Sequence, residues 1–95
     1  MLAVSRKGDT CTGHGCHPPR ASLEGSPNVF INGKPAHRVG DAWASHTCGD
    51  NTHDGVCSSG SSVVFVNGKP LARVGDDVSC GAAVAVGSSN VFAGS

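Results

Sequence analysis

Residues 25–41 of the chain read Gly-Ser-Pro-Asn-Val-Phe-Ile-Asn-Gly-Lys-Pro-Ala-His-Arg-Val-Gly-Asp, and residues 60–76 read Gly-Ser-Ser-Val-Val-Phe-Val-Asn-Gly-Lys-Pro-Leu-Ala-Arg-Val-Gly-Asp. Twelve of the seventeen positions are identical, and the two copies are offset by 35 residues. So close a repeat in a chain of 95 residues indicates two copies of one structural unit.

Each copy has the pattern of a β-hairpin. In the first copy, the apolar run Val29–Ile31 is β-branched and aromatic, which suits a pleated strand. Asn32-Gly33 follows it directly, and Asn-Gly favours the type I′ hairpin turn because both central residues need a positive φ. Pro35, which lacks a backbone N–H, belongs at a strand edge or strand start. The second copy repeats this pattern over residues 63–70.

A third copy is split between the two ends of the chain. Residues 87–92 match the first half of the repeat, and Arg6, Gly8 and Asp9 match the second half. We therefore expect Val91-Phe92 to pair with the strand around residues 3–5, which would place the termini side by side. Closing three hairpins into a ring leaves few open strand edges. The prediction is an all-β, pseudo-threefold cone that forms one domain over residues 1–95.

The composition indicates a thin hydrophobic core. Hydrophobic residues make up 38% of the chain, and the aromatic residues are one Trp and three Phe. Phe30, Phe65 and Phe92 occupy the same phase of the three copies, so we predict that they form one apolar layer near the axis rather than three separate small cores. A chain with so little to bury usually needs a metal, disulfides or a partner for stability.

Charge and cysteine usage narrow the function class. The formal net charge is zero, which does not indicate a nucleic-acid or membrane-surface protein. No apolar run approaches the length of a membrane-spanning helix, and Met1–Lys7 is too short and polar for a secretory signal, so we expect assembly in the cytoplasm. Five cysteines in a reducing compartment indicate metal binding or free thiols rather than a disulfide framework.

Three loops separate the repeats, and each begins with Gly-Asp. We interpret Asp9, Asp41 and Asp76 as turn residues whose side chains bind the local backbone. His14 follows the first of them by five residues, His46 follows the second by five, and Cys80 follows the third by four. Threefold symmetry would bring these loops together at one end of the molecule, where each would supply one metal-binding side chain.

The middle loop is the longest and adds His53. The predicted metal ligands are therefore His14, His46, His53 and Cys80. Imidazole and thiolate suit tetrahedral Zn²⁺, and four protein ligands indicate a structural site. Iron is the alternative metal, because imidazole also binds it.

Other cysteines and histidines compete with this set. Cys48 is the main rival because it lies two residues from His46, and Cys57 is a lesser one. We predict that Cys11 and Cys16 are buried small hydrophobic residues and that His17 and His37 lie on the surface. Trp43 is predicted to be an anchor that packs the middle loop.

The duplicated motif resembles the PAAR-repeat family, and the resemblance covers essentially the whole chain. The name-giving segment appears as Pro35-Ala36-His37-Arg38 and as Pro70-Leu71-Ala72-Arg73, with His37 and Leu71 at positions where Ala is more usual. The residue pattern of the stretches 11–16 and 41–48 looks particularly like the branch found in phage tails.

The resemblance implies a short cone that caps the homotrimeric β-helical spike of a contractile injection machine and leads it through a target membrane. The spike would be VgrG-like, as in type VI secretion, or that of a contractile phage tail. A metal, commonly zinc, would lie near the point, held by His and Cys. We expect an apolar base around residues 29–31, 63–66 and 91–93 to bind one trimer per copy.

Two other functions fit parts of the sequence. One is a soluble zinc-binding adaptor, to which effectors would bind non-covalently because no toxin domain is fused to the chain. The other is a small metallohydrolase, in which three histidines would hold a metal with one open position. The second is disfavoured because the single glutamate, Glu24, lies far from the predicted ligands in sequence, and Asp50 and Asp54 are interpreted as solvated loop acids.

Overall fold

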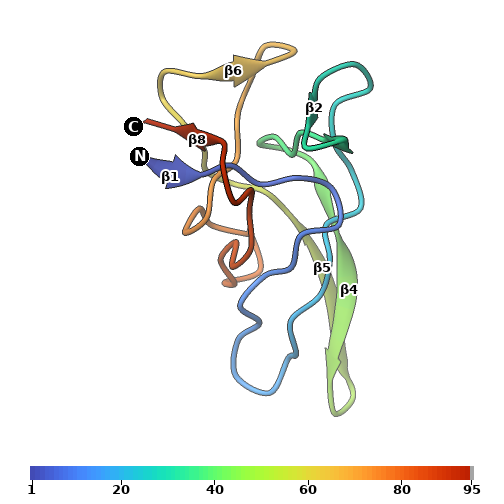
Figure 1. Ribbon diagram of the computed structural model, residues 1–95. Helices are drawn as coiled ribbons and strands as arrows, with labels where there is room; N and C mark the ends of the chain where they lie inside the picture. The colour runs from blue at the N-terminus through green and yellow to red at the C-terminus, as the bar shows by residue number, and fades with distance from the viewer. Residues whose placement is uncertain (95) are drawn as a thin grey trace.

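The computed structural model describes residues 1–94; Ser95, the last residue of the third copy and of the predicted domain, lies outside the described residues. Every regular element within this range is a strand, which confirms the all-β prediction. Figure 1 shows their arrangement. The strands are β1 (Leu2–Ala3), β2 (Phe30–Ile31), β3 (Lys34–Pro35), β4 (Ala42–Cys48), β5 (Asn51–Val56), β6 (Phe65–Val66), β7 (Lys69–Pro70) and β8 (Phe92–Ala93).

The three predicted hairpin units are present. β2 pairs with β3, and β6 pairs with β7, both antiparallel. Asn32 and Gly33 in the first turn have φ values of 55° and 79°, so both central residues adopt the left-handed conformation that type I′ turns require. The third unit joins the chain ends: β1 pairs with β8 and brings the termini together in Figure 1.

A closed set of backbone hydrogen bonds joins the three units. The N–H of Ser5 donates to the carbonyl of Ala72 (2.8 Å), that of Ala72 donates to His37 (3.0 Å), and that of His37 donates back to Ser5 (3.1 Å). These residues occupy the same phase of the three repeat copies. The pseudo-threefold axis therefore passes between them, and no unit can leave the ring without breaking a bond to each neighbour.

An arginine–aspartate pair closes each repeat just beyond this ring. In the middle copy, Asp41 accepts hydrogen bonds from the side chain and the backbone N–H of Arg38, all at 2.9 Å. Burial would raise the pKa of Asp41, but the hydrogen bonds from Arg38 outweigh it and hold that pKa below its usual value. The other two copies form the same pair, which confirms the predicted turn role of the three aspartates: Arg6–Asp9 and Arg73–Asp76.

The glycine that opens each repeat copy is required by close packing. A Cβ on Gly25 would lie 2.7 Å from Cβ of Pro35 and 2.9 Å from the carbonyl oxygen of Ala36. Gly60 and Gly87 approach the backbone of the equivalent strand equally closely. The start of each copy therefore lies directly against its own second strand, which only a residue without a side chain permits.

The three phenylalanines do not form the predicted apolar layer on the axis. Phe30, Phe65 and Phe92 are 57%, 55% and 50% exposed. Successive side chains of a strand point to opposite faces, and the residue that follows each phenylalanine points inward instead. The resulting core cluster contains Val4, Ile31, Ala36, Val66, Leu71 and Ala93.

The middle loop forms a long hairpin rather than irregular structure. β4 and β5 pair antiparallel, with a bulge between Trp43 and His46. Trp43 is buried and serves as a packing residue, as predicted, although it does so from a strand. Its neighbours form a second core cluster further along the axis, made up of Cys11, Trp43, Val78, Ala82 and Val84.

The molecule is elongated, with principal extents of 38 × 24 × 21 Å. The three short hairpin units lie at one end, and the β4–β5 hairpin runs toward the other (Figure 1). None of the structure described for residues 1–94 is a helix of the length and apolarity needed to cross a membrane.

His37 was predicted to lie on the surface and is fully buried. Its Nδ1 donates to the carbonyl of Glu24 (2.8 Å), and its ring meets the Trp43 indole edge-on, with centroids 5.1 Å apart. Within the described residues, its Nε2 is buried without a hydrogen-bond partner. Burial lowers the pKa of His37, so this imidazole is neutral in the folded protein at neutral pH.

We expect the buried imidazole to make folding sensitive to mild acid. Because the folded-state pKa of His37 lies below its unfolded value, the unfolded chain binds a proton first as the pH falls below about 6.5. The free energy of unfolding should therefore decrease between pH 7 and pH 5, with a slope from this residue of at most about 1.4 kcal/mol per pH unit. Denaturant titrations at several pH values, with a chelator present to keep the protein free of metal, measure this free energy of unfolding.

The matched variant is His37→Ala, because Ala72 occupies the equivalent position of the second copy. It should be less stable at pH 7, because a cavity opens beside Trp43. Its free energy of unfolding should, however, fall less steeply between pH 7 and pH 5. An equal slope in the two proteins would contradict the assignment of this acid sensitivity to His37.

Candidate metal centre

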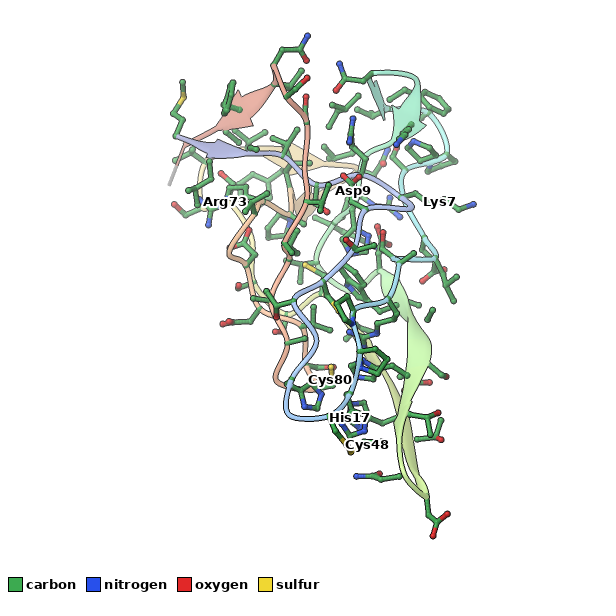
Figure 2. All side chains as sticks on the ribbon, turned by 60° about the horizontal axis from the view of Figure 1, so that its bottom comes forward. Lys7, Asp9, His17, Cys48, Arg73 and Cys80 are labelled. Carbon is green, nitrogen blue, oxygen red and sulfur yellow. A yellow bond between two sulfur atoms is a disulfide. The ribbon has the colours of Figure 1, made fainter. Side chains whose placement is uncertain are left out.

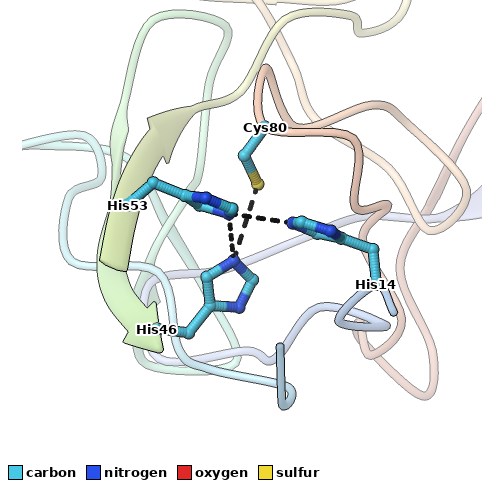
Figure 3. A group of neighbouring side chains, drawn as sticks. All are labelled: His14, His46, His53 and Cys80. Atoms are coloured by element: carbon cyan, nitrogen blue, oxygen red, sulfur yellow. Dashed lines mark hydrogen bonds between the residues drawn. The ribbon is translucent and has the colours of Figure 1, made fainter. Parts of the chain in front are cut away.

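Three separate segments bring the predicted site residues together. The ring nitrogens of His14, His46 and His53 and the sulfur of Cys80 all lie within 4.8 Å of one another. Figure 3 shows the four side chains converging on one point from the first loop, the β4–β5 hairpin and the third loop. Figure 2 places Cys80 in the narrow half of the molecule, away from Lys7 and Arg73.

A two-residue turn presents His14. The backbones of His14 and His17 exchange hydrogen bonds at 3.1 and 2.8 Å across Gly15-Cys16. Gly13 precedes this turn with φ 69°, and a Cβ there would lie 2.5 Å from the carbonyl oxygen of His17. The first loop is therefore folded tightly back on itself, which directs the His14 ring toward the axis.

Strand pairing presents the two histidines of the hairpin. His46 and His53 are directly opposite each other in β4 and β5, so their side chains share one face. Nδ1 of His46 lies 2.8 Å from the carbonyl of Pro18 and must donate to it, because a carbonyl only accepts. The Nε2 of a neutral His46 therefore carries a lone pair, and this atom faces the cluster.

A tight turn over residues 78–82 presents Cys80. The N–H of Val78 donates to Ala82 (2.8 Å), and that of Gly81, at φ 106°, donates to Val78 (2.9 Å). The Cys80 sulfur lies 3.9 Å from Nε2 of His46 and 3.2 Å from Nη2 of Arg20. The thiol is thus held at the edge of the imidazole cluster with a guanidinium beside it.

The electrostatics of the cluster fit a cation. Nε2 of His53 lies 2.9 Å from Nε2 of His14 and 2.7 Å from Nε2 of His46. Nε2 of His46 can only accept, and one nitrogen cannot donate its single proton along both directions, so these two close contacts cannot both be hydrogen bonds. Desolvation lowers the pKa of His14 and His53, and the neighbouring imidazoles lower it further, which favours neutral rings. Neutral imidazole nitrogens and a cysteine sulfur, bound as the thiolate, are a donor set that suits Zn²⁺.

His17 is the histidine whose position was wrongly predicted here. It was expected at the surface but is 8% exposed, and its ring packs against three of the cluster, with centroids 4.2 Å from His53 and 4.6 Å from His14. Its Nε2 lies 3.2 Å from the carbonyl of Asn51, so it points away from the point of convergence. The phase rule left His17 out of the predicted set, and the cluster of His14, His46, His53 and Cys80 does not include it, but the rule could not reveal the two-residue turn that buries it.

The structure removes both cysteine rivals from the site. Cys48, the main rival ligand, forms a disulfide with Cys16, which was expected to be buried and is exposed. The expectation of metal-binding or free cysteines rather than disulfides is therefore wrong for this pair. The bond links the first loop to the end of β4. Cys16 and Cys48 each lie seven residues after the aspartate that opens their loop, a shared phase that could have indicated this pair. Cys57 is buried and donates to the carbonyl of Ser59, and burial raises its pKa to about 12, so it stays a thiol.

Cys11 is buried, as predicted, but has polar partners. Nη1 of Arg20 lies 3.0 Å from its sulfur, and the N–H of Gly13 lies 3.4 Å away. Burial would raise the pKa of Cys11, but the hydrogen bonds from Arg20 and Gly13 outweigh it, so this pKa lies below its usual value.

The cysteines should differ in their reaction with iodoacetamide. In chelator and without reductant, Cys80 should be alkylated, because it is partly exposed, whereas buried Cys11 and Cys57 should be protected. Cys16 and Cys48 should react after reduction. Peptide mass spectrometry measures each site, with guanidinium-unfolded protein as the control that labels every thiol. Labelling of Cys57 before Cys80 would contradict this description.

Comparison with protein-family models matches the PAAR motif over residues 2–50 and again over residues 12–86. The two matches together cover most of the chain and include all the residues of the cluster. Comparison with the curated proteins gives no match. The repeat, the threefold ring and the family match agree, and the chain belongs to the PAAR motif family.

Proposed function

We propose that this protein is the metal-pinned tip of the trimeric spike of a contractile injection machine, either a type VI secretion system with a VgrG-like spike or a contractile phage tail. The chain acts as one domain, residues 1–95, and makes or breaks no bond. The observation that carries the proposal is the separation of two features along one pseudo-threefold molecule. An apolar, three-part surface lies at the broad end, and a His₃Cys cluster lies toward the narrow end (Figures 1 and 2).

The broad end suits a homotrimeric partner. Phe30, Phe65 and Phe92 are exposed to nearly the same extent, 50–57%, at equivalent positions of the three units. Exposed apolar groups that recur in this way indicate an interaction surface. Each chain of a homotrimer presents the same surface, so one molecule with three near-equivalent faces can satisfy all three chains. We call this surface the base; its exposed apolar residues are Leu2, Val29, Phe30, Val63, Phe65, Val91 and Phe92.

The narrow end suits a structural metal. His14, His46, His53 and Cys80 would hold Zn²⁺, or iron as the alternative, and the ion would supply four bonds that join three segments of the chain. With four protein ligands no coordination position is left for a substrate, which favours a structural role over hydrolysis. The core is thin here, since the second core cluster contains only one large side chain, Trp43.

The mechanism that follows is mechanical. A tip that leads a contracting tube through a membrane is compressed along its axis, which would force the three loops apart. The Arg–Asp pairs hold the start of each loop, and the metal ligands would hold the far part. The base would transmit the load to the trimer, and contact with the target membrane would be brief. Effectors would attach non-covalently.

Loss of a ligand should release the metal and destabilise the fold. We expect His14→Ala and Cys80→Ala to retain less metal through purification, because each removes one of the four protein ligands and leaves a position that only water can fill. Structural zinc contributes about 10–16 kcal/mol in finger peptides, so the Tm should fall by about 20 °C or more. Inductively coupled plasma mass spectrometry gives the identity and content of the metal, and differential scanning calorimetry gives the Tm.

His17→Ala is the matched control, since His17 packs on the same rings but directs its Nε2 to the backbone of Asn51. It should keep the metal. Metal content that is unchanged in His14→Ala and Cys80→Ala would refute the ligand set, and protein that purifies without any metal would refute the metal-pinned tip.

Truncating the base should abolish binding to the spike. Burying one phenylalanine contributes about 1.5–3 kcal/mol, so each of Phe30→Ser, Phe65→Ser and Phe92→Ser should weaken binding by about tenfold or more, and the triple variant should not bind. Isothermal titration against a VgrG-like or phage spike trimer measures affinity and stoichiometry, which should be one molecule per trimer.

Leu23→Ser is the control for this series, because Leu23 is equally exposed, at 53%, and lies outside the hairpin units. It should bind like the wild type. Three phenylalanine variants that bind normally would show that the base is not the docking surface, and wild-type protein that binds no trimer would favour the soluble adaptor.

A further inference from the structure

Arg20 is a buried cation whose partners are unusual. The residue is 7% exposed, and within residues 1–94 no ion pair joins it to an aspartate or glutamate. The other three arginines named above, Arg6, Arg38 and Arg73, each pair with a carboxylate. A charge removed from water is costly unless it is paired and hydrogen-bonded. The groups around Arg20 must therefore supply that compensation.

Arg20 donates to two sulfur atoms, where the other arginines donate to a carboxylate. Nη2 of Arg20 lies 3.2 Å from the sulfur of Cys80, and Nη1 lies 3.0 Å from the sulfur of Cys11. Nε donates to the carbonyl of Ala44 at 2.7 Å, and the guanidinium carbon lies 5.4 Å from the centre of the Trp43 ring. Each of the three guanidinium nitrogens thus has a partner, which fixes the orientation of the side chain.

The position of Arg20 follows from local pairing in the first loop. The N–H of Cys11 donates to the carbonyl of Arg20 at 3.0 Å, and the next pair, Thr10 and Ala21, forms a β-bridge. The two residues are therefore neighbours across this small ladder, and the Arg20 side chain crosses from the first loop to both β4 and the turn that holds Cys80. One residue outside the predicted ligand set touches all three segments that the set joins.

We propose that Arg20 is the positioning residue for the sulfur ligand: its guanidinium donates a charge-assisted hydrogen bond to the Cys80 thiolate and fixes the direction from which that sulfur meets the metal. Cys11 is the second sulfur that aligns the fork. The inference rests on the proposed metal centre and goes beyond it by assigning roles to two residues that are not ligands.

The chemistry of this contact predicts a specific effect on the bound metal. A thiolate that accepts a hydrogen bond from a cation gives less charge to the metal and is a weaker nucleophile than a free one. Groups that orient ligands from outside the coordination shell typically change metal affinity by 10–100-fold when removed. Arginine suits this place because its fork reaches two acceptors at once, which an ammonium cannot do.

The experiment uses the full chain loaded with Co²⁺, whose visible bands report tetrahedral geometry and whose near-ultraviolet band reports charge transfer from sulfur. In Arg20→Gln the visible bands should persist, the sulfur band should move to longer wavelength, and Co²⁺ affinity, measured by competition with a chelating dye, should fall by about 10–100-fold. An unchanged sulfur band and affinity would overturn the role of Arg20.

Two variants separate the hydrogen bond from charge alone. Lys7→Gln removes one positive charge at an exposed site far from Cys80 (Figure 2) and should leave the spectrum as in the wild type. Arg20→Lys keeps the charge without the fork and should resemble Arg20→Gln. A wild-type spectrum in Arg20→Lys would show that the charge suffices and would overturn the fork as the cause.

A second pair of variants keeps the test valid if Arg20→Gln does not fold. Cys11→Ala removes the sulfur that aligns the fork, whereas Cys11→Ser keeps an acceptor of similar size; the first should shift the sulfur band and the second should shift it less. Equal, wild-type spectra in the two would overturn the role of Cys11. Wild-type protein that binds no Co²⁺ would remove the metal centre itself, whereas Co²⁺ binding without any Arg20 effect would overturn this inference alone.

Discussion

The cyclic exchange of backbone hydrogen bonds between Ser5, His37 and Ala72 is the constraint on which the rest of this structure depends. Each segment both donates to one neighbour and accepts from the other, so the three repeat copies are locked at a fixed angle around one axis. Four residues beyond the ring, each copy reaches an aspartate that is paired with its own arginine. The loops therefore begin from equivalent points, which is why their far parts meet.

Stability along the axis comes from different interactions at different levels. Near the base, the inward residue of each short strand joins a core cluster of aliphatic side chains. The ring and the Arg–Asp pairs follow, and then a second cluster around Trp43. Beyond it the molecule narrows, little apolar surface remains to bury, and the polar side chains of His14, His46, His53 and Cys80 converge. A narrow end cannot be stabilised by a hydrophobic core, so coordination is the physically reasonable replacement.

The alternation of strand side chains explains how the short strands form both a core and an exposed apolar base. Ile31, Val66 and Ala93 point toward the axis, and the phenylalanine before each points outward. Predicting the phenylalanines as core residues was therefore an error of one position. Their shared place in the repeat makes them equivalent to one another, but it does not say which face of the strand points inward. The same two-residue period leaves the largest apolar side chain of each short hairpin unit, its phenylalanine, exposed at the base.

The sequence by itself determined the repeat, the Asn-Gly turns, the closure of the ring by the two chain ends, and the phase that singled out His14, His46 and Cys80. These are local or periodic properties, and a duplicated motif makes them readable. The tertiary structure alone decided that His37 and His17 are buried, that Cys16 pairs with Cys48, and that Arg20 lies between two sulfurs. Each of these depends on which segments distant in sequence lie side by side, and a phase shared by two loops does not say which of their side chains become buried or bonded.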